Sequence, residues 1–131
     1  MNARNDRAHK RLGRDGEAAA AAYLTRNGYR IIAENYRCKI GEIDLIAKKG
    51  NTICFVEVKS RRNLSYGRPC ESVGVKKQQH IRRTASYFLM KEWKGLGADC
   101  STGFRFDVAE VIFGETGAET AQIDYIEDAF R

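Results

Sequence analysis

Two apolar segments separated by a four-residue turn place the strongest constraint on the fold. The first runs from Glu42 to Ala47, the turn is Lys48-Lys-Gly-Asn51, and the second runs from Thr52 to Lys59. A glycine-asparagine turn between two β-prone segments indicates a β-hairpin. The second segment is apolar on both faces, which is typical of a central strand that is covered on both sides.

Three ionisable side chains interrupt this apolar hairpin. Asp44 lies in the first segment, whereas Glu57 and Lys59 lie near the end of the second, two residues apart and on one strand face. Burying charges is costly unless they pair or bind a metal. One interpretation is an ion-pair cluster at a strand end, and the other is a metal site.

The metal interpretation rests on the oxygen donors that the two strands offer. Two carboxylates on adjacent strands can hold Mg²⁺ or Mn²⁺, and the backbone carbonyl of Val58 can add a third oxygen. Such a metal would stabilise charge on a phosphoryl oxygen and lower the pKa of a bound water. Lys59 would then orient the water, help to deprotonate it, or stabilise the developing charge.

The remaining pattern predicts a mixed α/β domain with helices packed on a central sheet. The predicted helices cover residues 14–26 and 75–94, and further strands cover 29–36, 104–113 and 122–126. Residues 1–12 are basic and predict a flexible N-terminal arm, and residues 13–131 a single domain. Residues 61–74 predict a loop. Asp107, in an alternating strand, is expected to pair with an arginine.

Glu17 lies near the start of the first predicted helix. Ala20, Ala21 and Leu24 follow it at helical spacing, on the face expected to meet the sheet. One interpretation directs Glu17 toward the same strand ends as Asp44 and Glu57. The other is a favourable interaction of its carboxylate with the positive end of the helix dipole.

Charge is distributed unevenly along the chain. The net charge is +6; residues 1–97 carry 21 basic and 9 acidic side chains, and residues 98–131 carry 2 and 8. This asymmetry favours a polyanion-facing surface. The basic residues expected to contact nucleic-acid phosphates are Arg61, Arg62, Lys76, Lys77 and Arg83. The alternative is an ordinary solvated basic surface.

The chain has no apolar segment long enough to cross a membrane and no apolar stretch typical of a secretion signal. Its four cysteines, Cys38, Cys54, Cys70 and Cys100, form no pair at zinc-binding spacing. We therefore expect reduced thiols in a cytoplasmic protein.

Several motifs together resemble a known family. The stretches that carry the resemblance are Gly13-Arg-Asp-Gly-Glu17, Gly28-Tyr29, Asn35-Tyr-Arg37, Gly41-Glu-Ile-Asp-Leu-Ile-Ala47, Phe55-Val-Glu-Val-Lys-Ser-Arg61 and Arg105-Phe-Asp-Val108. They resemble the YraN family of bacterial proteins, predicted endonucleases, within the PD-(D/E)xK superfamily. That superfamily has the restriction-endonuclease-like fold, and its order of helix, three strands, helix and strand matches the predicted order here. The pattern is also similar to that of archaeal Holliday-junction resolvases.

The resemblance implies a role for each matching residue. Asp44 and Glu57 would be metal ligands, Lys59 the catalytic lysine and Glu17 an accessory carboxylate, while Ile43 replaces the superfamily's nominal proline. The implied function is a metal-dependent endonuclease that hydrolyses phosphodiester bonds of DNA, including branched or flapped DNA, with RNA left open as a substrate. A junction-cutting enzyme would act as a homodimer, because two symmetric strands need two sites.

Two other functions fit the same sequence. The first is a non-catalytic nucleic-acid-binding or adaptor protein on a nuclease-like scaffold, which would bind through the basic arm, the Arg61–Arg62 loop and the second helix. The second is a structural interaction protein whose acidic C-terminal quarter meets a basic partner.

Overall fold

Two helices and five strands make up the part of the chain that the structure describes. The computed structural model describes residues 3–62, 73–114 and 121–131, with side chains from residue 13 onward. The elements in chain order are α1 (Ala3–Arg26), β1 (Arg30–Arg37), β2 (Glu42–Lys49), β3 (Thr52–Arg62), α2 (Val75–Glu92), β4 (Gly103–Phe113) and β5 (Gln122–Phe130). The predicted order of helix, three strands, helix and two strands is confirmed.

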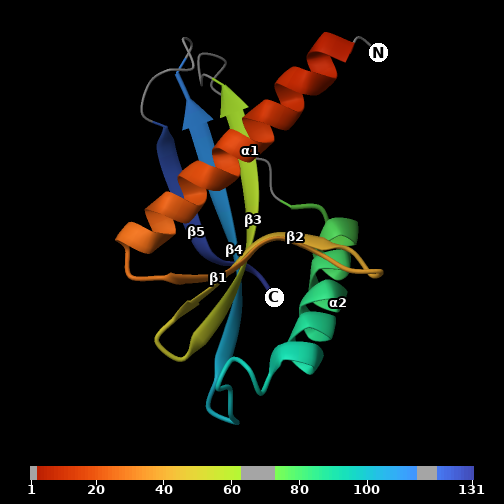
Figure 1. The fold of residues 1–131 in the computed structure, drawn as a ribbon, viewed down its shortest axis with the longest axis vertical. Coiled ribbons are helices and arrows are strands. Elements are labelled where there is room, and N and C mark those ends of the chain that lie inside the picture. The colour runs from red at the N-terminus through yellow and green to blue at the C-terminus, as the bar shows by residue number, and fades with distance from the viewer. Residues whose placement is uncertain (1–2, 63–72, 115–120) are drawn as a thin grey trace.

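The five strands form one mixed sheet in the order β1-β2-β3-β4-β5 (Figure 1). Strands β2 and β3 pair antiparallel, as predicted for the hairpin, and Gly50 in the turn has a φ of +59° that glycine adopts at little cost. Strand β4 pairs parallel with β3, because α2 carries the chain back across the sheet between them. Strand β3 is therefore central, as its two apolar faces predict.

Alternate residues of β3 enter two separate apolar cores. Ile53 and Phe55 pack on the α2 side, where the Phe55 and Phe88 rings meet edge to face at 6.0 Å. Cys54 and Val56 pack on the α1 side with Leu24. Truncating Phe55 to alanine would cost about 3–5 kcal/mol, the usual range for a buried phenylalanine. The two helices thus cover opposite faces of the sheet and hold β3 rigidly between them.

Helix α1 is longer than predicted. It begins at Ala3, whereas the prediction has a flexible arm over residues 1–12 and a helix start at residue 14. Neither proline nor glycine interrupts residues 3–12, and their alanine, arginine, lysine and leucine residues favour helix. Gly28, with a φ of +86°, follows the helix as predicted. The division into an arm and a single domain over 13–131 stays a prediction.

Strand β3 is also longer than predicted. It continues through Arg61 and Arg62, which the sequence analysis assigns to a loop. The pairing of β3 with β4 also includes these two residues. The parallel partner strand therefore stabilises an extended backbone at a place where the composition alone predicts a loop. Most of the predicted loop, residues 63–72, lies outside the described residues.

Asp107 is completely buried and lies at the centre of a polar cluster. Arg105 contacts its two oxygens at 2.8 and 2.9 Å, the Tyr125 hydroxyl donates to it at 2.6 Å, and the Asp128 N–H donates at 2.9 Å. Burial, together with Asp107, raises the pKa of Tyr125 above its ordinary value. The prediction that Asp107 pairs with an arginine is confirmed, and the cluster ties β5 to β4.

Two smaller predictions concern membranes and cysteines. Neither of the helices, over the residues that the structure describes, has the length and apolarity that a membrane crossing needs. Cys38, Cys54 and Cys100 are free, and Cys70 lies outside the described residues. Burial, and then the charge of Asp107, raise the pKa of the Cys54 thiol to about 12.

Candidate active site

The candidate site lies where strands β2 and β3 part. Their backbone pairing reaches Leu45 and Val56, and the next residues outward are Asp44 and Glu57. At this point the Val58 N–H donates to Asp44 Oδ2 at 2.8 Å. In a continued strand pair the Val58 N–H would donate to a backbone carbonyl of β2. Here the Asp44 carboxylate is the acceptor instead, at the point where the strand pairing ends. The prediction that Asp44 and Glu57 lie together on neighbouring strands agrees with this register.

Asp44 has an unusual charge environment. Burial, and then the charges of Glu57 and Glu17, raise its pKa to about 7. The hydrogen bond from the Val58 N–H opposes this shift. The carboxylates of Glu57 and Glu17 therefore both lie near enough to repel that of Asp44, in a place where water cannot fully screen the charges. A cation bound among them would relieve that repulsion.

Glu57 is buried and forms an ion pair with a lysine of the second helix. Its side chain is 7% exposed, and Lys77 Nζ lies 2.5 Å from Glu57 Oε1. Burial would lower the pKa of Lys77, but the hydrogen bond and charge of Glu57 outweigh it and raise the pKa above its ordinary value. Lys77 is one of the residues that the sequence predicts to contact nucleic acid. The structure instead places it on a candidate metal ligand.

Lys59 lies two residues beyond Glu57 on the same face of β3. The uninterrupted register with β4 fixes this alternation, because no bulge shifts the face between the two residues. Lys59 is partly buried. Its position is the one that the spacing predicts, on the same strand as Glu57 and one side-chain repeat farther along.

Glu17 follows the residue at which α1 approaches β3 very closely. A Cβ atom added to Gly16 would lie 1.7 Å from Ser60 Oγ and 2.9 Å from Ser60 Cβ, so any larger residue would force the helix or Ser60 to shift. The next residue, Glu17, is partly buried, and its charge acts on Asp44. This favours the interpretation in which Glu17 belongs to the site.

The other predicted basic residues divide into two groups. Arg61 pairs with the buried Glu110, with Nε and Oε1 3.0 Å apart. Arg62, Lys76 and Arg83 are exposed. Lys76 and Arg83 are seven residues apart, about two helical turns, so they share one face of α2. The exposed group is available to a polyanion, whereas Arg61 already has a buried partner.

Glu110 is a site neighbour that the sequence analysis missed. It lies opposite Lys59 in the β3–β4 register and is 3% exposed. A carboxylate within the apolar run of β4 is the same signal that marks Asp44 and Glu57. The row of charges on the α2 side therefore continues from β3 onto β4.

The donors at this site fit a hard divalent cation. Asp44 and Glu57 supply carboxylate oxygens, and the Val58 carbonyl leaves the strand on the same side as the N–H that Asp44 binds. Among the residues described, no group of three or more His, Cys, Asp or Glu side chains could hold a metal by itself. A small number of protein ligands is enough for Mg²⁺, because this ion keeps several waters in its coordination shell.

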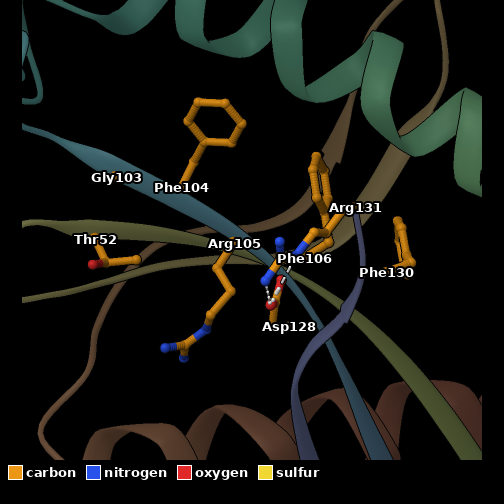
Figure 2. Close-up of a pocket in the computed structure, with 8 residues that line it drawn as sticks. All are labelled: Thr52, Gly103, Phe104, Arg105, Phe106, Asp128, Phe130 and Arg131. Carbon is orange, nitrogen blue, oxygen red and sulfur yellow. Dashed lines mark hydrogen bonds and ion pairs between the residues drawn. The ribbon is translucent and has the colours of Figure 1, made fainter.

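A surface hollow of about 500 Å³ lies at the opposite end of β3, where β3 and β4 begin. In Figure 2, Phe104 lies on the α2 side of the sheet and Arg105 points to the other side. Phe106, Phe130 and Arg131 also line the hollow. None of the predicted site residues does, so the hollow is separate from the candidate active site.

A mixed five-stranded sheet with one helix on each face defines an α/β protein, and its element order agrees with the restriction-endonuclease-like core that the motifs predict. The chain belongs to the protein family UPF0102. The sequence profile of that family, described as "Uncharacterised protein family UPF0102", matches residues 16–111. This is the YraN family, so the resemblance to that family is confirmed.

Relatives at high identity cover nearly the whole chain. A UPF0102 protein of Alkaliphilus metalliredigens is 51% identical over 121 residues, which cover 92% of this chain and 98% of the relative. One from Syntrophus aciditrophicus is 48% identical, covering 92% and 89%. One from Caldicellulosiruptor saccharolyticus is 44% identical, covering 92% and 98%.

Proposed function

We propose that this protein is a metal-dependent endonuclease that hydrolyses phosphodiester bonds in DNA, and that it belongs to the PD-(D/E)xK superfamily. The observation that carries the proposal is the meeting of Asp44 and Glu57 where β2 and β3 part. Crowding two carboxylates in a partly buried place is costly. A function that needs a bound cation explains why the fold keeps both.

Each residue then has a stated task. Asp44, Glu57 and the Val58 carbonyl would hold Mg²⁺ or Mn²⁺, which supplies charge stabilisation to the phosphate and activates water. Lys59 would orient the attacking water or stabilise negative charge on the phosphate. Glu17 would act as an accessory carboxylate from α1. The Val58 N–H holds Asp44 in place, with Oδ2 as its acceptor.

The charge distribution supports the proposal that DNA is the substrate. The first 97 residues have a net charge of +12, from 21 basic and 9 acidic residues. Arg62, at the end of β3, and Lys76 and Arg83, on α2, are exposed on the elements that carry the site. Exposed cations on those elements favour a phosphate backbone.

A non-catalytic nucleic-acid-binding protein is the second candidate. The observation that favours it is the Lys77–Glu57 ion pair, because a lysine already compensates one of the two carboxylates. In that case the charged cluster would be structural, and the basic surface would bind DNA without cutting it.

A substrate panel separates the two candidates. We expect the wild-type protein to cut at least one of linear, nicked, flapped and four-way DNA with Mg²⁺ or Mn²⁺, and to cut none in EDTA. Asp44→Asn, which keeps an acceptor for the Val58 N–H, and Lys59→Met should lose roughly 100-fold or more in rate while retaining DNA affinity.

The matched controls are Glu92→Gln and Lys94→Met, two exposed side chains at and just beyond the C-terminal end of α2, the end away from Lys77. Both should cut at the wild-type rate. Failure of the wild-type protein to cut any of these substrates with either metal, while it still binds them, would establish the second candidate.

A further inference from the structure

Lys77 joins the second helix to a candidate metal ligand in a position that the helix itself disfavours. It lies in the first turn of α2, which contains no acidic residue and has no side-chain cap. A cation there interacts unfavourably with the positive end of the helix dipole. The contact with Glu57 Oε1 is therefore what stabilises the lysine in this place.

The two partners of this ion pair differ in their freedom to move. The Lys77 side chain is 59% exposed, whereas that of Glu57 is 7% exposed. Lysine carries a hydrated ammonium on a flexible stem, so Lys77 can turn outward without moving the backbone. Glu57 is held in the sheet and stays where it is. Lys77 is the partner that can leave.

Lys77 also acts on the second carboxylate. Its positive charge opposes the upward shift of the Asp44 pKa that Glu57 and Glu17 produce. The ammonium therefore lies close to both residues that would hold a divalent cation. Two cations cannot occupy this place together without strong repulsion.

We propose that Lys77 is a positioning residue that occupies Glu57 in the metal-free protein and leaves when a divalent cation binds, so that metal and DNA bind with positive coupling. The coupling arises because DNA phosphates draw Lys77 outward and thereby open the site to the metal. This inference rests on the metal site of the proposed function. By linkage, the metal must strengthen DNA binding by the same factor.

The first test is metal affinity without DNA, measured as Mn²⁺ binding by isothermal titration calorimetry at mildly alkaline pH. Lys77→Met should bind Mn²⁺ about tenfold more tightly than the wild-type protein, within the usual range of coupling between sites. Lys94→Met, at an exposed lysine just beyond the far end of α2, should leave the affinity within about twofold. Glu57→Gln should weaken binding in both backgrounds.

A second variant protects the test against a purely structural effect. Lys77→Arg keeps a cation beside Glu57 and can bind the carboxylate through two N–H groups, so it should weaken Mn²⁺ binding. Thermal unfolding in EDTA checks that each variant is folded. Opposite changes in Lys77→Met and Lys77→Arg would not arise from a general loss of stability.

The coupling is tested with a short DNA duplex in the Lys59→Met background, where cleavage does not interfere. Mn²⁺ should bind more tightly with the duplex than without it, and this difference should be smaller when Lys77→Met is added, because only the direct contact of the metal with the phosphate remains.

Each remaining outcome is decisive. If the wild-type protein binds Mn²⁺ and Lys77→Met binds it no more tightly, the inference is wrong and the metal site stands. If no protein with Asp44 and Glu57 intact binds Mn²⁺, with or without DNA, both the metal site and the inference are wrong. Binding without cleavage would contradict only the proposed activity.

Discussion

At the residue scale, Asp44 shows how one side chain can end the pairing of two strands and also concentrate negative charge there. Its carboxylate replaces a backbone carbonyl as the acceptor for the Val58 N–H. The same placement takes it away from water and brings it near Glu57. The backbone hydrogen bond is satisfied, but the negative charge is not fully compensated.

This imbalance predicts a pH-dependent stability of the metal-free protein. Burial and Glu57 raise the folded-state pKa of Asp44 to about 7, above its unfolded value near 4. The folded state then binds a proton that the unfolded state has lost, so Asp44 reduces stability as pH rises from about 4 to about 7. In EDTA, Asp44→Asn should unfold at higher urea concentration than the wild-type protein at about pH 8.

The difference between the two proteins should shrink toward zero at about pH 4, where both carry a neutral side chain. Urea unfolding across this range measures it. A difference that stays constant with pH would show that Asp44 keeps an ordinary pKa in the fold.

At the element scale, the contact between α1 and β3 depends on one missing side chain. Gly16 lets the helix lie against Ser60, and this sets where Glu17 stands relative to the strands. Glycine inside a helix costs about 1 kcal/mol relative to alanine. The close approach of α1 to Ser60 explains why the helix has glycine at this position despite that cost.

Gly16→Ala should therefore lower the free energy of unfolding, although alanine favours helix. The added Cβ would collide with Ser60 Oγ and Cβ, and overpacking of this kind costs roughly 1–3 kcal/mol, more than the gain in helix propensity. Combining it with Ser60→Gly should remove the collision. The two substitutions should then be less destabilising together than the sum of their separate effects.

Urea unfolding of the four proteins in this cycle measures the interaction. Gly13→Ala is the matched control, because a Cβ at Gly13 would meet nothing within 4 Å. Simple additivity of Gly16→Ala and Ser60→Gly would mean that the helix does not rest on Ser60.

The features of the fold and site that could be predicted are those that depend on contacts between residues close together in the sequence. Asp44 and Glu57 are joined by one short hairpin, so alternation and a tight turn suffice to bring them together. The ion pair between Lys77 and Glu57 could not be predicted, because the position of Lys77 depends on how α2 packs after the chain crosses the sheet. The predicted start of α1 at residue 14 is wrong, because basic composition does not distinguish a flexible arm from a helix.

At the scale of the whole molecule, the charge distribution predicts how DNA binding responds to salt. Affinity should fall steeply as salt rises, because each phosphate contact releases counterions. Arg83→Ala should weaken binding and reduce the slope of log affinity against log salt by about 0.9, the value for one lost contact. Arg30→Ala, an exposed arginine at the Lys48 end of the sheet, should change neither.

Fluorescence anisotropy with a duplex in EDTA measures these slopes without cleavage. Equal losses for Arg83→Ala and Arg30→Ala would show that the protein binds DNA through its overall charge and not through the α2 face.

The hairpin determines the order in which the charged groups come together during folding. Asp44 and Glu57 lie on the hairpin, whereas Lys77 lies on α2. A hairpin closes in about 1–10 μs, whereas parallel pairing of β3 with β4 must wait for the whole α2 crossover. During folding, the two carboxylates therefore face each other before the lysine of α2 arrives. A divalent cation bound at the proposed site would meet no competitor at that moment, and it would assist the folding of the hairpin as well as serve the proposed reaction.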